Sequence, residues 1–228
     1  MKTDIVRIAI RPPEYLPRLH FIALMQSVDV LVLADTFQYS RQSFQNRTRV
    51  RTPQGTHWIS IPLLGRQHGR PCIQTVIDSS IHWRSKHLRS ISFNYSQTPY
   101  FGFIADGLQT LYQSEQAYLA DVTCQSVEMM QQMYQVGCTV VRASALAGCP
   151  ASLQGILELM PAKTLVVPAD DLHQAEAAPI PVEVLHLDET AYRQQFEGFY
   201  PGTSALDLLC NYGPEAPGMV RDSLKIVQ

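Results

Sequence analysis

The first 35 residues alternate between apolar strands and a short helix. Residues 5–10 form a β-branched run, which is typical of a buried strand. Pro17 suits the first turn of a helix, where its missing N–H costs nothing, and apolar residues follow it at helical spacing. A second apolar run covers residues 28–34. This strand, helix, strand order predicts a parallel α/β sheet, whose ligands gather at the carboxyl ends of the strands, where Arg11 and Asp35 fall.

The remaining chain continues the alternation of strands and helices. We expect helices at 83–95, 101–112, 115–136 and 152–160, and strands at 74–78, 138–143, 164–167 and 182–187. Ser114 and Gly137 would cap the third of these helices. The predicted fold class is α/β: a mainly parallel sheet flanked by helices, with an inserted β-hairpin and a helical segment, in one domain of residues 1–228.

Residues 46–63 read as the inserted hairpin. Arginines alternate with other residues, with period two, up to Thr52-Pro53-Gln54-Gly55, a sequence that suits a turn, and residues 57–61 return as the partner strand. Arg47, Arg49 and Arg51 share one face of the first strand. Such a row of guanidinium groups could bind a phosphate or carboxylate through paired hydrogen bonds, with Arg47 and Arg49 favoured over Arg51. Alternatively, charged side chains protect an exposed edge strand from pairing.

The polar segment 35–55, which leads into and includes the first hairpin strand, is the best candidate for a binding site. It holds many polar side chains and few residues able to form a core. It contains no metal-ligand spacing, no nucleophile beside a base and no Walker-type glycine loop. The segment therefore indicates binding, with a small anion such as a nucleotide sugar as the expected partner, and does not identify a reaction.

Charge divides the chain into a basic half and an acidic half. Residues 1–100 hold 13 Lys and Arg against 5 Asp and Glu, whereas residues 101–228 hold 5 against 15, for a net charge of −2. This distribution indicates either a basic surface that meets an anionic ligand or a basic lobe docked on an acidic one. Nucleic acid is a weaker expectation, because the sequence pI of about 6.4 lies below that of a basic nucleic-acid domain and zinc-finger spacings are absent from the sequence.

The composition of 46% hydrophobic and 17% charged residues describes a globular protein. The sequence has no apolar run long enough to span a bilayer and no signal-peptide layout at its start, so we expect a cytoplasmic location. Its five cysteines are scattered without a C-x-x-C pair, which indicates buried, reduced thiols. The sequence identifies no cofactor, favours no metal site and leaves homo-oligomer formation open.

Two further segments carry candidate residues. Lys86 and His87 lie on the polar opening of the 83–95 helix and could face the anion site, although a basic residue on a helix is commonly just solvated. Ser204 stands three residues before Asp207, as in a capping box, which offers Asp207 a purely structural role.

Three separated stretches resemble the WbqC-like family. They are Ala9-Ile10-x-x-Pro13-x-Tyr15-Leu16-Pro17 continuing to Asp35-x-x-Gln38-Tyr39 and Asn46-Arg47, then His82-Trp83-x-x-Lys86-His87-Leu88, then Ser204-x-x-Asp207-Leu208-Leu209-x-Asn211-x-Gly213. Members of this family are found among polysaccharide and O-antigen biosynthesis genes. The resemblance therefore implies a role in that biosynthesis, in which the protein could attach an acyl or aminoacyl group to amino sugars. The matched polar residues are Tyr15, Asp35, Gln38, Tyr39, Asn46, Arg47, Arg49, Lys86, His87, Asp207 and Asn211.

The chain also departs from the family pattern. The glycine-rich stretch expected after a late strand is 167–171, Val-Pro-Ala-Asp-Asp, in this sequence. Without those glycines, fewer backbone N–H groups can approach a phosphate closely. This branch could therefore bind a different ligand, or keep the fold without the chemistry.

Two hypotheses from different classes follow. In the first, the protein is a transferase or ligase acting on a nucleotide-activated sugar: Arg47 and Arg49 hold the phosphates, Asp35 holds a sugar hydroxyl or a cation, and His87 or His20 is the general base. In the second, the same fold is a non-catalytic binding or scaffolding protein whose basic face grips an acidic partner. A third, weaker idea compares His20, at a helix start, with the histidine of nucleotidyltransferases; its simpler interpretation is a partly buried helix residue.

Overall fold

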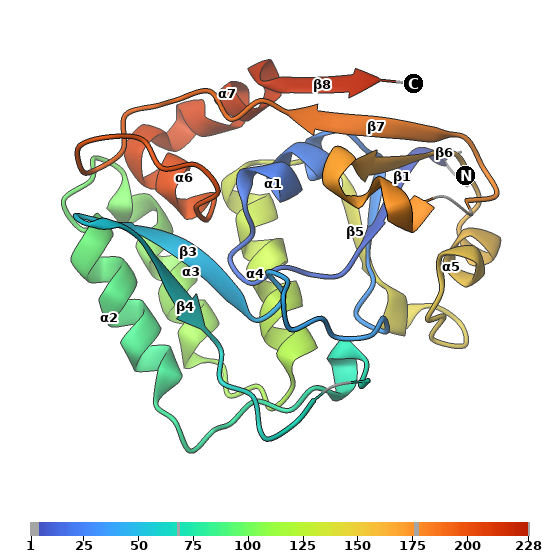
Figure 1. The fold of residues 1–228 in the computed structure, drawn as a ribbon, viewed down its shortest axis with the longest axis horizontal. Coiled ribbons are helices and arrows are strands. Elements are labelled where there is room, and N and C mark those ends of the chain that lie inside the picture. The colour runs from blue at the N-terminus through green and yellow to red at the C-terminus, as the bar shows by residue number, and fades with distance from the viewer. Residues whose placement is uncertain (1–4, 68, 176–177, 228) are drawn as a thin grey trace.

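The protein is described by a computed structural model that covers residues 5–67, 69–175 and 178–227. Its centre is a six-stranded sheet of order β5-β2-β1-β6-β7-β8 (Figure 1). The strands are β1 (Ile5–Arg11), β2 (Val30–Leu33), β5 (Thr139–Arg142), β6 (Ala162–Pro168), β7 (Val182–Leu187) and β8 (Leu224–Val227). All neighbouring pairs are parallel except β7 with β8. The predicted fold class is therefore confirmed.

Helices cover both faces of the sheet, because the side chains of each strand alternate between two cores. On β1, Ala9 joins the larger core with α1 (Leu19–Gln26), α2 (Trp83–Tyr95), α3 (Phe101–Gln113), α4 (Leu119–Met133), α6 (Leu206–Tyr212) and α7 (Ala216–Asp222). Ile8 points to the smaller core with α5 (Leu153–Leu159) and the 3₁₀ segment Ala169–Ala175. The larger core contains residues from both the basic and the acidic half of the chain, so the two halves are packed together.

Most predicted elements are present, and the differences are local. The expected strand at 74–78 is wrong: a short 3₁₀ turn, Cys72–Gln74, precedes two isolated bridges at Val76 and Ile77. Helix α4 begins four residues later than expected, and Ser114 does not cap it, since its hydroxyl donates to the Thr110 carbonyl of α3. Helix α7 and strand β8 were not anticipated. Within the described residues, the structure contains no helix long and apolar enough to cross a membrane.

The predicted hairpin is confirmed as a separate two-stranded sheet of β3 (Arg47–Thr52) and β4 (Gly55–Ser60). Thr52 pairs with Gly55 across the expected turn, and Arg49 pairs with Trp58. Gly55 has a φ of +125°, which side-chain-bearing residues rarely adopt, and the ring of Tyr200 lies against it. In Figure 1 the hairpin crosses in front of helices α2, α3 and α4.

Arg51 fixes the hairpin to the long loop, 188–205, that connects β7 to α6. Its side chain is fully buried. The guanidinium group donates to the carbonyl of Gly55 (2.9 Å) within the hairpin, and to the carbonyl of Glu197 and the side-chain oxygen of Gln194 (3.0 Å) in the loop. The ring of Tyr200 stacks on it, 4.5 Å from the guanidinium carbon. The loop is thus ordered around a single buried cation.

This arrangement corrects the predicted row of three arginines. Only Arg47 and Arg49 reach the surface, because the loop 188–205 covers the end of the hairpin that carries Arg51. The guanidinium group of Arg51 is occupied by backbone and amide oxygens, so it has a structural role.

Replacing Arg51 by Met should destabilise the protein by about 3 kcal/mol, because the buried oxygens of Gly55 and Gln194 and the partly buried carbonyl of Glu197 would lose their donor. Arg47→Met is the matched control on the same strand and should change the free energy of unfolding by less than about 0.5 kcal/mol. Urea unfolding of both variants checks this prediction; equal losses would contradict the assigned role of Arg51.

Candidate functional site

The candidate site lies at the carboxyl edge of the parallel strands. Arg11 ends β1, Asp171 follows β6, and Glu189 follows β7, so residues far apart in sequence meet at this edge. In chain order the six strands are arranged 3-2-1-4-5-6, and the direction of winding changes between β1 and β6. Ligands of doubly wound sheets bind outside the strand ends at that change of direction.

Ion pairs fill the edge between β1 and β6. Arg11 contacts the carboxylates of both Asp171 and Glu14, and Arg18 contacts Glu14 at 2.8 Å. Burial disfavours the charged form of Glu14, but the guanidinium groups of Arg18 and Arg11 hold its pKa below the usual value. The cavity between these strands measures only about 40 Å³, which is too small for a nucleotide.

Beside this edge, guanidinium groups and aromatic rings form a surface that we call the arginine–aromatic surface. The guanidinium carbons of Arg47 and Arg49 lie 4.4 and 4.8 Å from the centre of the Trp58 ring. Phe44 packs against Trp58 with ring centres 5.3 Å apart, and the guanidinium group of Arg18 stacks on Phe44 at 3.6 Å. All five side chains are partly exposed. Cation–π contact holds the arginines in place without neutralising them.

Arg47 and Arg49 differ from the neighbouring cations in their ion pairs. Across the described residues, no ion pair connects either guanidinium group to a carboxylate, although Arg11 and Arg18 are both paired. Arg47 donates to the carbonyl of Ser43 (3.2 Å), which leaves other donors of its guanidinium group available. Two adjacent cations without a counter-ion are suited to bind an anion.

The loop 188–205 joins the arginine–aromatic surface to the carboxyl edge of the sheet. The backbone N–H of Ser204 donates to the Arg49 carbonyl (2.8 Å), and a Cβ placed on Gly202 would lie 3.7 Å from the Arg49 guanidinium group. The N–H of Gly202 in turn donates to the Glu189 carboxylate (2.7 Å). Gly202 therefore lies between Glu189 and Arg49 in space. The second carboxylate oxygen of Glu189 is 3.4 Å from Nδ1 of His20.

His87, an expected catalytic residue, belongs to a buried aromatic cluster. Its Nδ1 lies 2.8 Å from the Tyr15 hydroxyl, and Tyr15 also hydrogen-bonds Tyr112, while Trp83 packs edge-on against the histidine ring. Burial lowers the pKa of His87 to about 4, although a hydrogen bond with the backbone of Ser60 opposes the shift. His87 is thus neutral and enclosed, and it does not line the arginine–aromatic surface.

Asp35, the other expected catalytic residue, has both oxygens occupied. Its carboxylate accepts hydrogen bonds from the backbone N–H (2.9 Å) and the hydroxyl (2.5 Å) of Ser144, and only 1% of the residue is exposed. These bonds connect the end of β2 to the turn after β5. Asp35 therefore stabilises the ends of two neighbouring strands instead of presenting a free carboxylate.

Asp207 lies in the buried network around Arg51. One carboxylate oxygen accepts from Tyr192 (2.7 Å) and Gln194 (3.0 Å), and the same Gln194 contacts Arg51. Burial raises the pKa of Asp207 to about 6, against the lowering effect of Tyr192, Tyr95, Gln194 and Arg51. The capping-box interpretation of Asp207 is wrong, since its side chain turns inward, although the Ser204 hydroxyl does accept from the backbone N–H of Leu206 (3.3 Å).

The remaining predicted residues have local contacts. Tyr39 is buried and Gln38 exposed, and their segment is hydrogen-bonded to residues 70–72. Asn46 closes the open end of the hairpin through the Ile61 carbonyl (3.0 Å), and Asn211 donates to the Asp207 carbonyl (2.7 Å) within α6. Lys86 is exposed on α2.

Arg18, Phe44, Trp58 and Glu189 belong to the site and were absent from the predicted set. The pairing of Arg49 with Trp58 follows from the turn at residues 52–55, so that contact was available from the sequence. Glu189 had no comparable signal, because its position depends on the folding of the loop 188–205 around Arg51.

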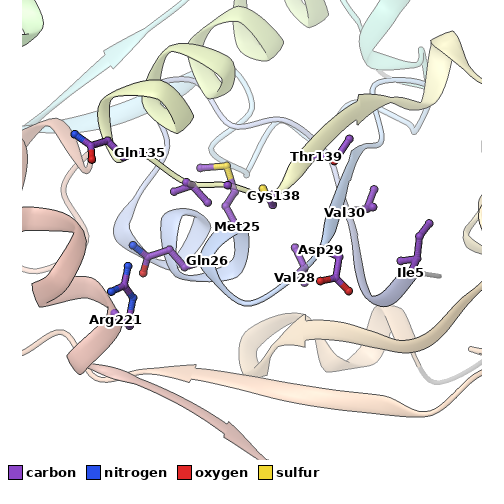
Figure 2. Close-up of a pocket in the computed structure, with 12 residues that line it drawn as sticks. Ile5, Met25, Gln26, Val28, Asp29, Val30, Gln135, Cys138, Thr139 and Arg221 are labelled. Carbon is purple, nitrogen blue, oxygen red and sulfur yellow. The ribbon is translucent and has the colours of Figure 1, made fainter. Parts of the chain in front are cut away.

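A larger hollow, of about 500 Å³, opens at the opposite edge of the sheet (Figure 2). Asp29, Val30 and Thr139 line it where β2 and β5 begin. The Asp29 carboxylate is already bound to the backbone N–H groups of Val6 and Arg7, each at 2.9 Å. Because ligands of parallel sheets gather at the carboxyl ends of strands, we do not assign the site to this amino edge.

Sequence comparison identifies the class of protein. The model of the WbqC-like protein family matches residues 12–218, and the chain belongs to this family. An uncharacterized protein of Mycobacterium tuberculosis (strain ATCC 25618 / H37Rv), Rv1507c, is 29% identical over 243 residues, covering 94% of this chain and 97% of that protein. No solved structure matches the chain.

Replacing Asp35 by Ala should destabilise the protein by about 2 kcal/mol, because the partly buried N–H and hydroxyl of Ser144 lose their acceptor. Asp106→Ala, on the exposed face of α3, is the control and should change the free energy of unfolding by less than about 0.5 kcal/mol. Urea unfolding measures both; a loss at Asp35 no larger than the control would show that the carboxylate is not structural.

His87 and Asp207 should have opposite effects on stability in the same pH window. Between pH 6.5 and about 4 the unfolded chain protonates His87 while the folded chain does not, so this group lowers stability as the pH falls. Between pH 3.8 and about 6 the folded chain protonates Asp207 while the unfolded chain does not, so this group raises stability as the pH falls.

Relative to the wild type, His87→Gln should therefore gain stability as the pH falls from 6 to 4.5, by up to about 1.4 kcal/mol per pH unit. Relative to the wild type, Asp207→Asn should lose stability as the pH falls over the same range. Urea unfolding at several pH values measures the slopes. If both variants keep the wild-type slope, the two assigned protonation states are incorrect.

Proposed function

We propose that the protein binds a nucleotide-activated sugar at the arginine–aromatic surface and modifies cell-surface polysaccharide or amino sugars, as a transferase or ligase that attaches an acyl or aminoacyl group. The observation that carries this proposal is the pair Arg47 and Arg49. Both are stacked on Trp58, both are partly exposed, and within the described residues neither has a carboxylate partner.

A diphosphate fits the chemistry of this pair. Each guanidinium group offers several N–H donors in a planar fork, and two such groups can bind successive phosphates through charge-assisted hydrogen bonds. The bound anion would also remove the repulsion between the two cations. A free phosphate would satisfy the same donors, so the nucleotide and sugar must add affinity of their own.

The aromatic part of the surface supplies contacts for such groups. Trp58 and Phe44 lie next to each other and are partly exposed. Any nucleobase can stack on an aromatic side chain, because every base has a π-face. Arginines and aromatic rings together thus match a ligand that combines phosphates with a planar ring.

Membership of the WbqC-like family supports the polysaccharide part of the proposal, because the sequence resemblance implies a setting among polysaccharide and O-antigen biosynthesis genes.

The amino end of α1 and the ends of β1 and β7 border the same surface, which agrees with the usual position of nucleotide sites in doubly wound sheets.

One observation favours a second candidate, a binding protein without turnover. The two residues expected to be catalytic, Asp35 and His87, are buried and bonded inside the fold. On this alternative, the arginine–aromatic surface grips an acidic protein partner. Such binding would weaken strongly with salt and would not discriminate between nucleotide sugars and inorganic phosphate.

Thermal unfolding in the presence of nucleotide sugars, nucleotides and inorganic phosphate tests the proposal. A nucleotide sugar at 100 times its dissociation constant should stabilise the wild type by about 2.7 kcal/mol. Arg49→Ala and Arg47→Ala should remove this stabilisation. Lys225→Ala, an exposed cation on β8, should keep it.

Three outcomes of this experiment contradict parts of the proposal. Equal stabilisation by phosphate alone would leave a phosphate site without a nucleotide. Stabilisation that persists in both arginine variants would place the ligand elsewhere. Absence of any stabilisation would leave the acidic-partner alternative.

A further inference from the structure

We propose that His20 is the acid–base residue of this site and that Glu189 positions it. This inference rests on the proposed function, since it assigns the proton transfer that the attachment of an acyl group requires. Neither Asp35 nor His87 can supply that step from its buried position.

The two side chains are brought together by different elements at the carboxyl edge. His20 lies in the first turn of α1, and Glu189 follows β7. Nδ1 of His20 and Oε1 of Glu189 are 3.4 Å apart, with side-chain exposures of 29% and 10%. The carboxylate is therefore largely enclosed, whereas part of the imidazole ring remains open to solvent.

Glu189 is held in one orientation. Its other oxygen accepts the backbone N–H of Gly202 at 2.7 Å. Burial disfavours the charged form, but the nearby His20 side chain, the hydrogen bond from Gly202 and the charge of Arg18 keep the pKa of Glu189 below its usual value. An ionised Glu189 facing Nδ1 favours the tautomer with hydrogen on Nδ1, which leaves Nε2 with a lone pair to accept a proton.

Gly202 connects this pair to the anion-binding arginines. It contacts Glu189 through its N–H and lies beside the guanidinium group of Arg49. The acid–base pair and the phosphate-binding pair are thus on opposite sides of one glycine. A ligand with its phosphates on Arg47 and Arg49 would have its sugar within the region that His20 borders.

The transfer step is balanced with an activated acyl or aminoacyl donor as co-reactant. Nε2 takes a proton from a hydroxyl or amino group of the bound sugar while that oxygen or nitrogen forms a bond to the donor's carbonyl carbon. The electron pair of the broken bond departs with the donor's leaving group, which then receives the proton from the imidazolium ion. Glu189 stabilises the imidazolium charge and takes no proton itself.

The pair could be tested without knowing the donor, by NMR of protein labelled with ¹⁵N in histidine. His20→Asn assigns the His20 signals among those of the seven histidines. In the free protein the tautomer should carry its hydrogen on Nδ1. Glu189→Gln should reduce the fraction of this tautomer, because it removes the negative charge that faces Nδ1.

Addition of UDP-N-acetylglucosamine as the probe gives the functional readout. The Nε2 signal of His20 should shift in the wild type and in Glu189→Gln, but not in Arg49→Ala, while the signal of His186, exposed on β7, stays unchanged. A purely structural pair would give no ligand-dependent shift.

The outcomes separate the two proposals. If the probe binds in an Arg49-dependent manner and the His20 signal does not move, the acid–base assignment is overturned and the proposed function stands. If the probe does not bind, both fall. If the free protein carries its hydrogen on Nε2, or if Glu189→Gln leaves the tautomer fractions unchanged, the positioning role of Glu189 is overturned.

Discussion

The buried guanidinium group of Arg51 is the interaction on which the candidate site depends. It binds oxygens from the hairpin and from the loop 188–205, and Gln194 extends the network to Asp207 on α6. A buried cation without such partners would be very costly, so the loop must close around it for the fold to be stable. The closed loop carries Glu189 and Gly202 to the side of Arg49, where no short-range sequence signal would bring them.

The three arginines of β3 show how one strand can serve structure and binding. They are two residues apart and share a face of the hairpin, yet their environments differ because the loop covers only the end near the turn. Arg51 is saturated with hydrogen bonds, whereas Arg47 and Arg49 stack on Trp58 and keep donors free. Arg47 and Arg49 differ from the other cations at the sheet edge in their charge balance. Arg11 and Arg18 are neutralised by Asp171 and Glu14.

The sequence predicted the sheet and the hairpin because those elements have local signals. Apolar runs define β1, β2 and β7, helical spacing defines α2 to the residue, and the turn at residues 52–55 fixes the hairpin register. The strand expected at 74–78 is wrong because the backbone of this segment makes only isolated bridges. Those bridges depend on tertiary contacts that the local sequence does not reveal. For the site, the sequence favoured Arg47 and Arg49 over Arg51, but it could not distinguish surface residues from the buried His87 and Asp35. That distinction depends on burial by residues more than 100 positions away, such as Glu197 and Ser144.

The most direct test of the central claim uses the two tryptophans of the chain, because Trp58 lies on the arginine–aromatic surface and Trp83 is only 2% exposed in the core. Intrinsic fluorescence should be titrated with a nucleotide sugar in the wild type and in Trp58→Phe. The account predicts a saturable change in the wild type, lost in Trp58→Phe, with the Trp83 signal constant. A saturable change that survives in Trp58→Phe would contradict it, since the ligand would then bind away from Arg47 and Arg49.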